Sequence, residues 1–308
     1  MTPIKVAIVG LGKIARDQHV PSLAANGEFE LAAVASPRST LAGVPNFRDL
    51  PALLQGVPEV SAIVLCTPPQ VRYEMAYEAL RQGRHVLLEK PPGVTVSEVL
   101  ALAELADQKG VTLFASWHSR HAAAVEAARA WLAPRTILGA TIAWKEDVRV
   151  WHPGQTWIWR AGGLGVFDPG INALSILTRI MPGTLFLQDA RLAYPSNCEA
   201  PIAAQLSLVG PQGARLNATF DFLQTGPQTW DIEVDTDAGR LTLSMGGTQM
   251  RVDGRRVQVA NIPEYATLYA HFAQLVRTQR SDVDVRPLQL VADAFLCARC
   301  EEAAEFVE

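Results

Sequence analysis

The chain has 308 residues, of which 49% are hydrophobic and 19% charged, and its formal net charge is -4 at pH 7. A chain of this length holds two domains of about 150 residues, or one large one. The acidic balance gives no reason to expect nucleic acid as a partner, because phosphates demand a basic surface. No apolar run reaches the roughly 18 residues that a membrane helix needs, and the first residues lack a signal-peptide pattern. We therefore expect a globular protein that uses neither a nucleic acid nor a membrane.

The four cysteines are few and scattered, at Cys66, Cys198, Cys297 and Cys300. Such usage favours a reducing cytoplasm over a disulfide-stabilised secreted fold. Cys297 and Cys300 form a C-x-x-C, but it lies in a helical pattern and no second Cys/His pair accompanies it. A zinc site needs such a second pair, so the sequence predicts no metal site.

The first part of the chain alternates apolar runs with amphipathic stretches. The runs are "IKVAIVG", "FELAAVAS", "VSAIVLCTPP", "RHVLLEKPP" and "VTLFASWH". Runs this uniformly apolar are typical of parallel strands buried on both faces. The stretches 68–83 and 95–110 are helix-like, and each ends at a glycine that suits a helix C-cap. Strand and helix in alternation predict a doubly wound α/β domain, of the Rossmann dinucleotide-binding type, over residues 1–118.

The pattern changes after a helix-like stretch near 120–133. The segments "ATIAWKEDV", "AAQLSLVG", "ARLNATFDF", "TWDIEVDT" and "RLTLSMGG" alternate apolar with polar residues. That alternation indicates an antiparallel sheet with one wet face. Two further helical stretches, near 264–279 and 287–306, end the chain. We predict that residues 119–308 form an α/β domain with a mainly antiparallel open sheet, and leave open whether the C-terminal helix packs back on the first domain.

The segment "GLGKIA" carries the first functional motif. Gly10, Gly12 and Ala15 have G-x-G-x-x-A spacing, directly after the first strand and at the start of a helix. The first glycine permits a tight turn, the second lets the backbone approach a pyrophosphate, and the alanine lets the helix pack closely. Free N–H groups at the helix start favour phosphates. The turn therefore predicts dinucleotide binding, with Lys13 and Ile14 as its remaining contacts; a glycine turn without a ligand is the alternative.

The end of the second strand selects the cofactor. An NAD site usually has Asp or Glu there, whereas this chain has Ser36, Pro37, Arg38 and Ser39. No carboxylate repels a 2′-phosphate, and Arg38 offers it a charge-assisted hydrogen bond. We therefore expect Ser36 and Arg38 to favour NADP, with NAD also accepted. The alternative is that Arg38 is only a solvated loop residue.

Two more motifs follow strands. Thr67 comes after "AIVLC", and Glu89 and Lys90 come after "HVLL". Open α/β sheets bind ligands at the carboxyl ends of their strands, so we expect all three residues at the cofactor. Pro91 and Pro92 restrict the backbone after Lys90, which suits a lysine held over a cofactor.

At this point the chain resembles the glucose-fructose oxidoreductase / inositol dehydrogenase / rhizopine catabolism (Gfo/Idh/MocA) family. The resemblance rests on "GLGKIA", "CTPP", "EKPP" and "GGLGVFDPGIN", in that order, with a matching domain layout. Within the family, "WKEDVRVWHPGQTWIW" and "FDPGIN" look like bacterial aldose 1-dehydrogenases for L-arabinose and D-galactose. The resemblance implies that Lys90 lies beside the nicotinamide and that Asp168 is the aspartate of the second motif. It also implies a homodimer or larger homo-oligomer formed through the C-terminal sheet.

This chain departs from the family at one position. Most members carry histidine four residues after that aspartate, often as the proposed proton acceptor, and this chain has Asn172. Asparagine is no useful proton acceptor, so the role must move elsewhere or be shared.

Asp168 also reads as a helix N-cap followed by Pro169, and the two interpretations are compatible. A carboxylate at a helix start is held in place and kept ionised by the helix dipole. Asn172 would then lie one turn later on the same face. Glycines 162, 163 and 165 would let the preceding loop run close to cofactor or sugar.

Three further residues are candidates for sugar binding. By strand alternation Glu146 shares an apolar face with Ile142 and Trp144, so it needs a partner, either a sugar hydroxyl or an ion pair within the fold. His152 lies in a tryptophan-rich loop, and His118 ends the fifth apolar strand. For each histidine a structural role is the alternative.

The sequence thus predicts an NAD(P)-dependent aldose 1-dehydrogenase that oxidises C1 of L-arabinose, D-galactose or D-fucose to the lactone. We expect Lys90 and Asp168 to take up the proton as a pair, with the lysine losing its own proton more readily beside a positively charged nicotinamide. Glu146, His152, Asn172 and His118 would bind sugar hydroxyls. The alternatives are a non-catalytic dinucleotide sensor and a same-family dehydrogenase acting on a ring alcohol such as an inositol.

Overall fold

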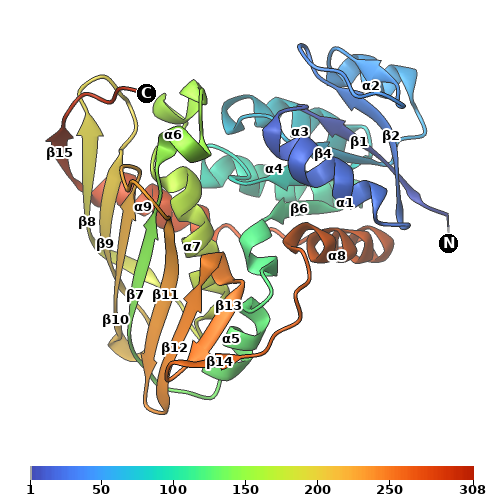
Figure 1. Ribbon diagram of the computed structural model, residues 1–308. Coiled ribbons are helices and arrows are strands. Elements are labelled where there is room, and N and C mark those ends of the chain that lie inside the picture. Colours follow the sequence, from blue (N-terminus) through green and yellow to red (C-terminus); the bar gives the residue numbers. More distant parts are fainter. Residues whose placement is uncertain (1) are drawn as a thin grey trace. The chain divides into compact units, whose positions relative to one another are not determined.

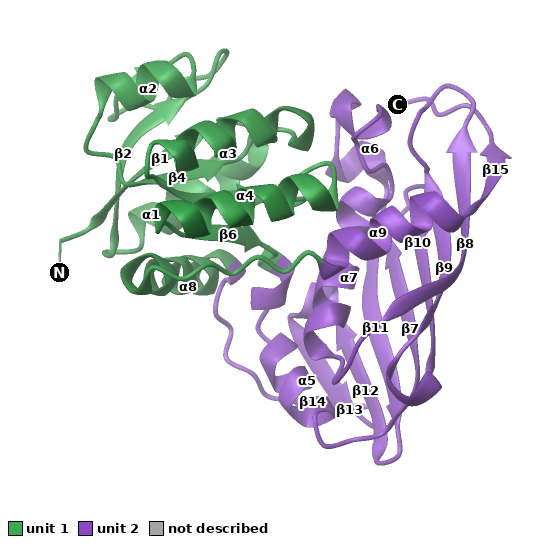
Figure 2. Cartoon of the chain, turned by 180° about the vertical axis from the view of Figure 1, so that it is seen from behind, with its two compact units in different colours: residues 1–118, 265–285 green, residues 119–264, 286–308 purple. Residues whose placement is uncertain are grey.

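The computed structural model describes residues 2–308, which form two compact units (Figure 2). The first unit runs to His118 and also contains Tyr265–Val285. The second contains Ser119–Glu264 and Arg286–Glu308. No helix within residues 2–308 has both the length and the hydropathy required to cross a bilayer.

The first unit is built on a six-stranded sheet in the order β3-β2-β1-β4-β5-β6, and every neighbouring pair is parallel (Figure 1). Its strands are β1 (Ile4–Val9), β2 (Phe29–Ala35), β3 (Asn46–Phe47), β4 (Ala62–Leu65), β5 (His85–Glu89) and β6 (Leu113–Ser116). The strand order reverses between β1 and β4, and ligands of open α/β sheets bind at such a switch point. The predicted Rossmann fold is confirmed.

Helices α1 (Val20–Ala24), α2 (Leu50–Gly56), α3 (Arg72–Arg81) and α4 (Val96–Lys109) connect these strands. Both ends of α4 carry residues that favour a helix terminus. Thr95 and Glu98 form a capping box at its start, and Gly110 ends it with φ of 66°. Glycine is favoured there because residues with a side chain rarely adopt that conformation.

The two faces of this sheet bury different layers. Ala7 and Val9 of β1 pack in one cluster with residues of α2, α3 and α4. Val6 and Ile8, which point the other way, pack in a second cluster with Tyr269 and its neighbours. Tyr269 belongs to α8 (Glu264–Thr278), so a helix distant in sequence completes the first unit. Each large side chain buried there stabilises the unit by ~1.5–3 kcal/mol.

The second unit contains a nine-stranded sheet in the order β14-β13-β12-β11-β7-β10-β9-β8-β15. Its strands are β7 (Ile137–Lys145), β8 (Phe186–Pro195), β9 (Ala203–Val209), β10 (Arg215–Asp221), β11 (Thr229–Thr236), β12 (Gly239–Ser244), β13 (Gln249–Val252), β14 (Arg255–Val257) and β15 (Arg299–Ala303). The pairs β10–β7 and β15–β8 are parallel and the others antiparallel. The mainly antiparallel sheet predicted for this part is confirmed.

The helices of the second unit are α5 (Val125–Leu132), α6 (Val148–Trp151), α7 (Phe167–Ile180) and α9 (Arg286–Cys297). Helix α7 contacts β7 and β11 of the sheet as well as α5 and α9 (Figure 2). Nearly all of its residues are buried, as expected for a helix covered on all sides. It therefore holds its side chains rigidly.

The last predicted helix is wrong in its second half. Helix α9 ends at Cys297, and Arg299–Ala303 pairs in parallel with β8 as the edge strand β15. The charged and alanine-rich segment has no apolar stripe, so pairing with an open sheet edge decides its structure. Helix α9 belongs to the second unit, and α8 is the helix that belongs to the first.

Candidate functional site

The glycine turn has the conformation that its motif requires. Gly10 has φ of 92°, and a Cβ there would lie 2.9 Å from the backbone of both Cys66 and Thr67. The turn after β1 therefore lies directly against the end of β4. At Gly12 an added Cβ would meet no atom within 4 Å, so this backbone has open space beside it. Ala15 is fully buried, which lets the helix approach the sheet.

Thr67 offers a test of whether the turn suits a dinucleotide. Its hydroxyl is buried and has no hydrogen-bond partner within residues 2–308. An unsatisfied buried polar group costs about 1–3 kcal/mol, and native structures keep few of them. A hydroxyl beside Gly10 in that state suits a polar ligand. The residues present therefore fit a pyrophosphate, held by the turn and the Thr67 hydroxyl.

The loop after β2 presents cations. Arg38 is exposed and Ser36 is half-buried, with its N–H donated to the Phe47 carbonyl. Arg16, on the turn after β1, donates to the carbonyl of Thr40, 3.0 Å away. Two arginines thus lie at the loop that selects the cofactor, one predicted from the sequence and one not. Lys13, by contrast, forms an exposed ion pair with Asp17.

The start of the helix after the glycine turn differs from the expected α-helix. Ala15–His19 forms a π-helical turn before α1. Such turns are rare and occur frequently at functional sites. In this turn His19 is fully buried and reaches Glu89 at the end of β5, with 3.0 Å between Nε2 and Oε1. The residue carries no motif that would have identified it in the sequence.

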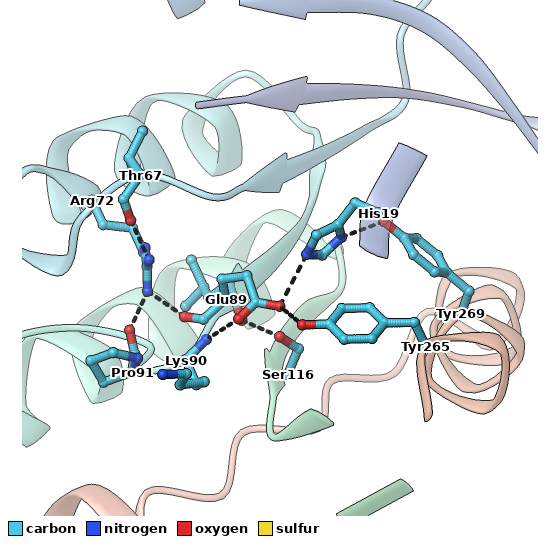
Figure 3. Close-up of polar contacts among 10 residues, drawn as sticks. His19, Thr67, Arg72, Glu89, Lys90, Pro91, Ser116, Tyr265 and Tyr269 are labelled. Atoms are coloured by element: carbon cyan, nitrogen blue, oxygen red, sulfur yellow. Dashed lines mark hydrogen bonds and ion pairs between the residues drawn. The ribbon is translucent and has the colours of Figure 1, made fainter. Parts of the chain in front are cut away.

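Glu89 is surrounded by protein groups (Figure 3). Besides His19, its Oε1 accepts a hydrogen bond from the Tyr265 hydroxyl at 2.8 Å, and its Oε2 accepts one from the Lys90 N–H at 2.9 Å. Burial alone would raise the pKa of Glu89, but the hydrogen bond and charge of His19, with smaller contributions from His118 and Tyr265, lower it to about 2. The Glu89 carboxylate is thus ionised, and both of its oxygens are bonded to protein groups. These bonds favour a positioning role for Glu89 over the predicted contact with the cofactor.

His19 carries the matching charge. Burial disfavours its charged form, but Cys66, Tyr269 and Glu89 outweigh burial and raise the pKa of His19 well above its ordinary value. Its Nδ1 lies 2.7 Å from the Tyr269 hydroxyl. Burial raises the pKa of Tyr269 to about 12, so that hydroxyl keeps its proton. The result is an imidazolium–carboxylate pair beside Lys90.

The structure places His118 in the same neighbourhood. It follows β6 and stacks on Tyr265, with ring centroids 5.5 Å apart and planes 18° apart. It belongs to the first unit, and its electrostatic contact is with Glu89. Sugar binding by His118 stays a prediction.

In the second unit the structure brings three of the predicted residues together. His152 lies between two buried carboxylates: its Nε2 is 3.0 Å from Glu146 Oε1, and its Nδ1 is 3.5 Å from Asp168 Oδ2. Glu146 and Asp168 are each 2% exposed. The 3.5 Å separation is an ion-pair distance and too long for a good hydrogen bond. The cluster is a carboxylate–imidazole–carboxylate row.

Glu146 was expected on a strand, but β7 ends at Lys145 and Glu146 directly follows it; it has the partner that its buried position requires. Its other oxygen accepts a hydrogen bond from Trp230 Nε1 at 2.8 Å. The partners are therefore within the fold, which was the alternative to a sugar hydroxyl. Glu146 orients His152, much as second-layer carboxylates orient catalytic imidazoles, and Trp230 on β11 fixes Glu146.

Helix α7 positions Asp168, but one detail of the prediction is wrong. The helix begins at Phe167 and Val166 is its N-cap, so Asp168 lies within the first turn and is not the cap. Gly165, with φ of 53°, turns the chain early enough for the helix to begin there. Asp168 still lies within the first turn, where the helix dipole stabilises negative charge.

Gly163 and Gly165 have a different purpose from the one expected. A Cβ on Gly163 would lie 2.3 Å from the Trp157 carbonyl oxygen, and one on Gly165 would lie 2.3 Å from that of Pro201. These glycines let the loop pack against protein backbone, so approach to a ligand does not explain them.

Asn172 lies one turn after Asp168 and is partly buried. Its side-chain amide has no hydrogen-bond partner within residues 2–308, whereas its backbone carbonyl accepts a hydrogen bond from the Ser175 hydroxyl. An amide left in this state suits a polar ligand.

A cavity of about 410 Å³ opens beside His152 in the same unit. The other walls include Arg149, Gln155, Trp159 and Arg160. Glu146, Asp168 and Asn172 are not among its lining residues. Of the predicted substrate residues, His152 alone reaches this cavity.

The chain is similar to known oxidoreductases. A family model described as "Oxidoreductase family, NAD-binding Rossmann fold" matches residues 4–116. The chain is 48% identical over 295 residues to galactose 1-dehydrogenase of Pseudomonas fluorescens, a match that covers 96% of each chain.

Solved structures give the same picture. The crystal structure of a D-galactose-1-dehydrogenase from Rhizobium etli superposes with a TM-score of 0.95 and 52% identity, over 100% of this chain and 99% of that one. KijD10, a 3-ketoreductase from Actinomadura kijaniata in complex with NADP and TDP-benzene, shares the fold alone, with a TM-score of 0.85 at 21% identity over 98% and 100% of the chains. The chain belongs to the Gfo/Idh/MocA family of NAD-binding oxidoreductases.

Proposed function

We propose that this protein is an NAD(P)-dependent aldose 1-dehydrogenase that oxidises C1 of D-galactose, L-arabinose or D-fucose to the lactone. The names of its relatives at 48% and 52% identity support a sugar dehydrogenase. The observation that carries the proposal furthest is the row of Glu146, His152 and Asp168. One member of this row, Asp168, is a buried carboxylate on helix α7, the helix that bears the family's second motif.

The reaction removes a hydride from C1 and a proton from the hydroxyl group on C1. When bound, the nicotinamide supplies the acceptor for the hydride. The chain has to orient the sugar and take up the proton of the C1 hydroxyl. We assign that proton to Lys90 and Asp168 as a coupled pair.

His152 accounts for the departure at position 172. Where most members carry a histidine on the helix, this chain has Asn172, and its imidazole comes from the loop after α6 instead. His152 Nδ1 faces the Asp168 carboxylate across 3.5 Å, and the proposal requires this contact to shorten when the sugar binds, so that a proton can pass between them. The proposal therefore gives His152 a supporting part in proton transfer and Asn172 a part in binding sugar hydroxyls.

One assay separates the proposal from its rivals. D-Galactose, L-arabinose, D-fucose and myo-inositol are each incubated with NADP or NAD, and absorbance of the reduced nicotinamide is followed. Turnover of the aldoses supports the proposal. Turnover of inositol alone indicates a ring-alcohol dehydrogenase, and binding of NADP without turnover of any sugar indicates a sensor.

We propose that NADP is preferred, with Arg38 and Arg16 as its selecting residues. A charge-assisted hydrogen bond to an exposed 2′-phosphate is worth about 1.5 kcal/mol, or about tenfold in affinity. Arg38→Ala is expected to weaken NADP binding about tenfold and to leave NAD binding within about twofold, as measured by fluorescence titration. Arg48→Ala, which removes an exposed arginine elsewhere in the unit, is the matched control. Equal loss for both cofactors would refute the assignment.

We also propose that the exposed face of the nine-stranded sheet forms contacts between copies of the chain. Thr141, Gln205 and Asn217 are exposed on neighbouring strands, where their side chains alternate with buried ones. Asn217→Arg is expected to convert a homo-oligomer into monomers, as measured by light scattering. A wild-type chain that is monomeric at micromolar concentration would contradict this proposal.

A further inference from the structure

The backbone around Lys90 is held from two sides. The Glu89 carboxylate accepts the Lys90 N–H at 2.9 Å. On the other side the buried guanidinium of Arg72 donates to the carbonyls of Glu89, Pro91 and Thr67 (Figure 3). The carbonyls of the residues on either side of Lys90, and the N–H of Lys90 itself, are thus fixed by buried charges, and Arg72 ties them to the end of β4.

Glu89 is in turn aimed by two donors. His19 and Tyr265 both bond to Oε1, at 3.0 and 2.8 Å, which leaves Oε2 directed at the Lys90 N–H. Tyr269 lies 2.7 Å from the far side of the His19 ring. Residues from three elements therefore meet at this one carboxylate: the turn after β1, the end of β5 and helix α8.

Stability alone does not explain this arrangement. A buried ion pair is often no more stabilising than apolar side chains of similar volume, because both charges lose their hydration. A core that needed only stability could place leucine and phenylalanine here. What the pair provides is direction: a charge-assisted bond fixes the carboxylate in one orientation.

We propose that His19 is a positioning residue: through Glu89 it sets the backbone of Lys90, so that the turn that carries Gly10 and Gly12 also places the reactive lysine. The continuous path runs from His19 Nε2 to the Glu89 carboxylate and on to the Lys90 N–H. The functional part of this inference rests on the proposed role of Lys90 in proton transfer.

Two substitutions at one site separate the two nitrogens of His19. The amide nitrogen of glutamine takes the place of Nε2 and keeps a donor for Glu89, whereas asparagine reaches only the place of Nδ1, next to Tyr269. Small misplacements of a reactive group cost up to about 100-fold in rate. We therefore expect His19→Asn to lower kcat about 10- to 100-fold, with KM for the aldose and Kd for NADP within about threefold. His19→Gln is expected to retain kcat within about threefold.

A second readout does not depend on activity. Acetylation of Lys90 in the cofactor-free protein is followed by peptide mass spectrometry, with the exposed Lys109 as internal reference. The ratio of the two rates is expected to change at least about threefold in His19→Asn and to stay near wild type in His19→Gln. If His19→Asn fails to fold, Tyr265→Phe and Tyr269→Phe replace it, and the first should lower kcat more because it removes a donor to Glu89 itself.

The outcomes are distinct. Equal kcat in the Asn and Gln variants, or a parallel loss of kcat and NADP affinity in both, would overturn the positioning role of His19. An unchanged kcat in Lys90→Ala would overturn the proposed function instead, and the acetylation ratio would still decide whether His19 positions Lys90.

Discussion

Lys90→Ala is expected to lower kcat for the aldose by about 10²–10⁴-fold, the range that a general acid–base group contributes. Asp168→Asn, which keeps the shape of the buried side chain, should lower kcat by a similar factor. Both residues are proposed to act on the same proton of the C1 hydroxyl, so removing either one should disable its transfer. Turnover is measured with D-galactose and NADP at saturating concentrations.

The double variant gives the sharper result. Residues that act as a unit have non-additive effects, so Lys90→Ala combined with Asp168→Asn should be no more than about threefold slower than the worse single variant. Independent roles would instead multiply the two losses. The Kd for NADP, from fluorescence titration, should stay within about threefold throughout. Turnover that survives within a few-fold in either single variant would disprove the proton-transfer assignment.

His152→Gln belongs to the same experiment as a matched comparison. A glutamine keeps a hydrogen-bond donor for Glu146 but removes the group that faces Asp168. If His152 supports the proton transfer, this variant should lose less than Asp168→Asn and none of its NADP affinity. A full loss equal to that of Asp168→Asn would identify His152 itself as the principal acceptor.

The sequence predicted the elements whose causes are local. The glycine turn, the apolar parallel strands and the ends of α4 depend on residues within one turn or one strand, and all are confirmed. The burial of Glu146 was also predictable, because it alternates with Ile142 and Trp144, which are apolar and pack in the core. What the pattern left open was the partner of that carboxylate.

The partners were hidden because they come from distant segments. Trp230 is 84 positions from Glu146, and Tyr265 is 176 positions from Glu89. No periodicity links such pairs, and His19 resembles any polar residue of an amphipathic helix until the π-helical turn directs it inward. Residues 299–303 were predicted as helix and form a strand for the same reason. Their pairing partner is the edge of β8, which is distant in the sequence.

The buried pair of His19 and Glu89 is expected to make folding stability depend on pH in both directions. Glu89 has its pKa lowered from 4.5 to about 2 in the folded chain. Its stabilisation is therefore complete above about pH 4.5 and is lost as the pH falls toward 2. His19 has a raised pKa, so its contribution is complete below its ordinary value of 6.5 and is lost as the pH rises through the folded value. The pair stabilises the protein most between about pH 4.5 and 6.5.

The lowered pKa of Glu89 corresponds to about 3 kcal/mol. The raised pKa of His19 is not added to this figure, because its bond to Glu89 is already counted there. Glu89→Gln removes the charge and leaves a buried imidazolium without its carboxylate. Breaking such a pair costs about 3–5 kcal/mol. We expect a loss of that size in the free energy of unfolding at pH 5.5, and a smaller difference from wild type at pH 3 and at pH 9.

Urea unfolding from pH 3 to 9 measures the loss, and hydrogen exchange assigns it to a unit. Amides of β4 and β5 in the first unit should lose protection in Glu89→Gln, while those of β9 and β10 in the second should keep it. Glu59→Gln is the control, because its carboxylate is paired with Lys5 at the surface and exposed pairs contribute little. A difference between Glu89→Gln and wild type that is constant across the pH range would mean that shape, and not the charge of the pair, stabilises the core around Lys90.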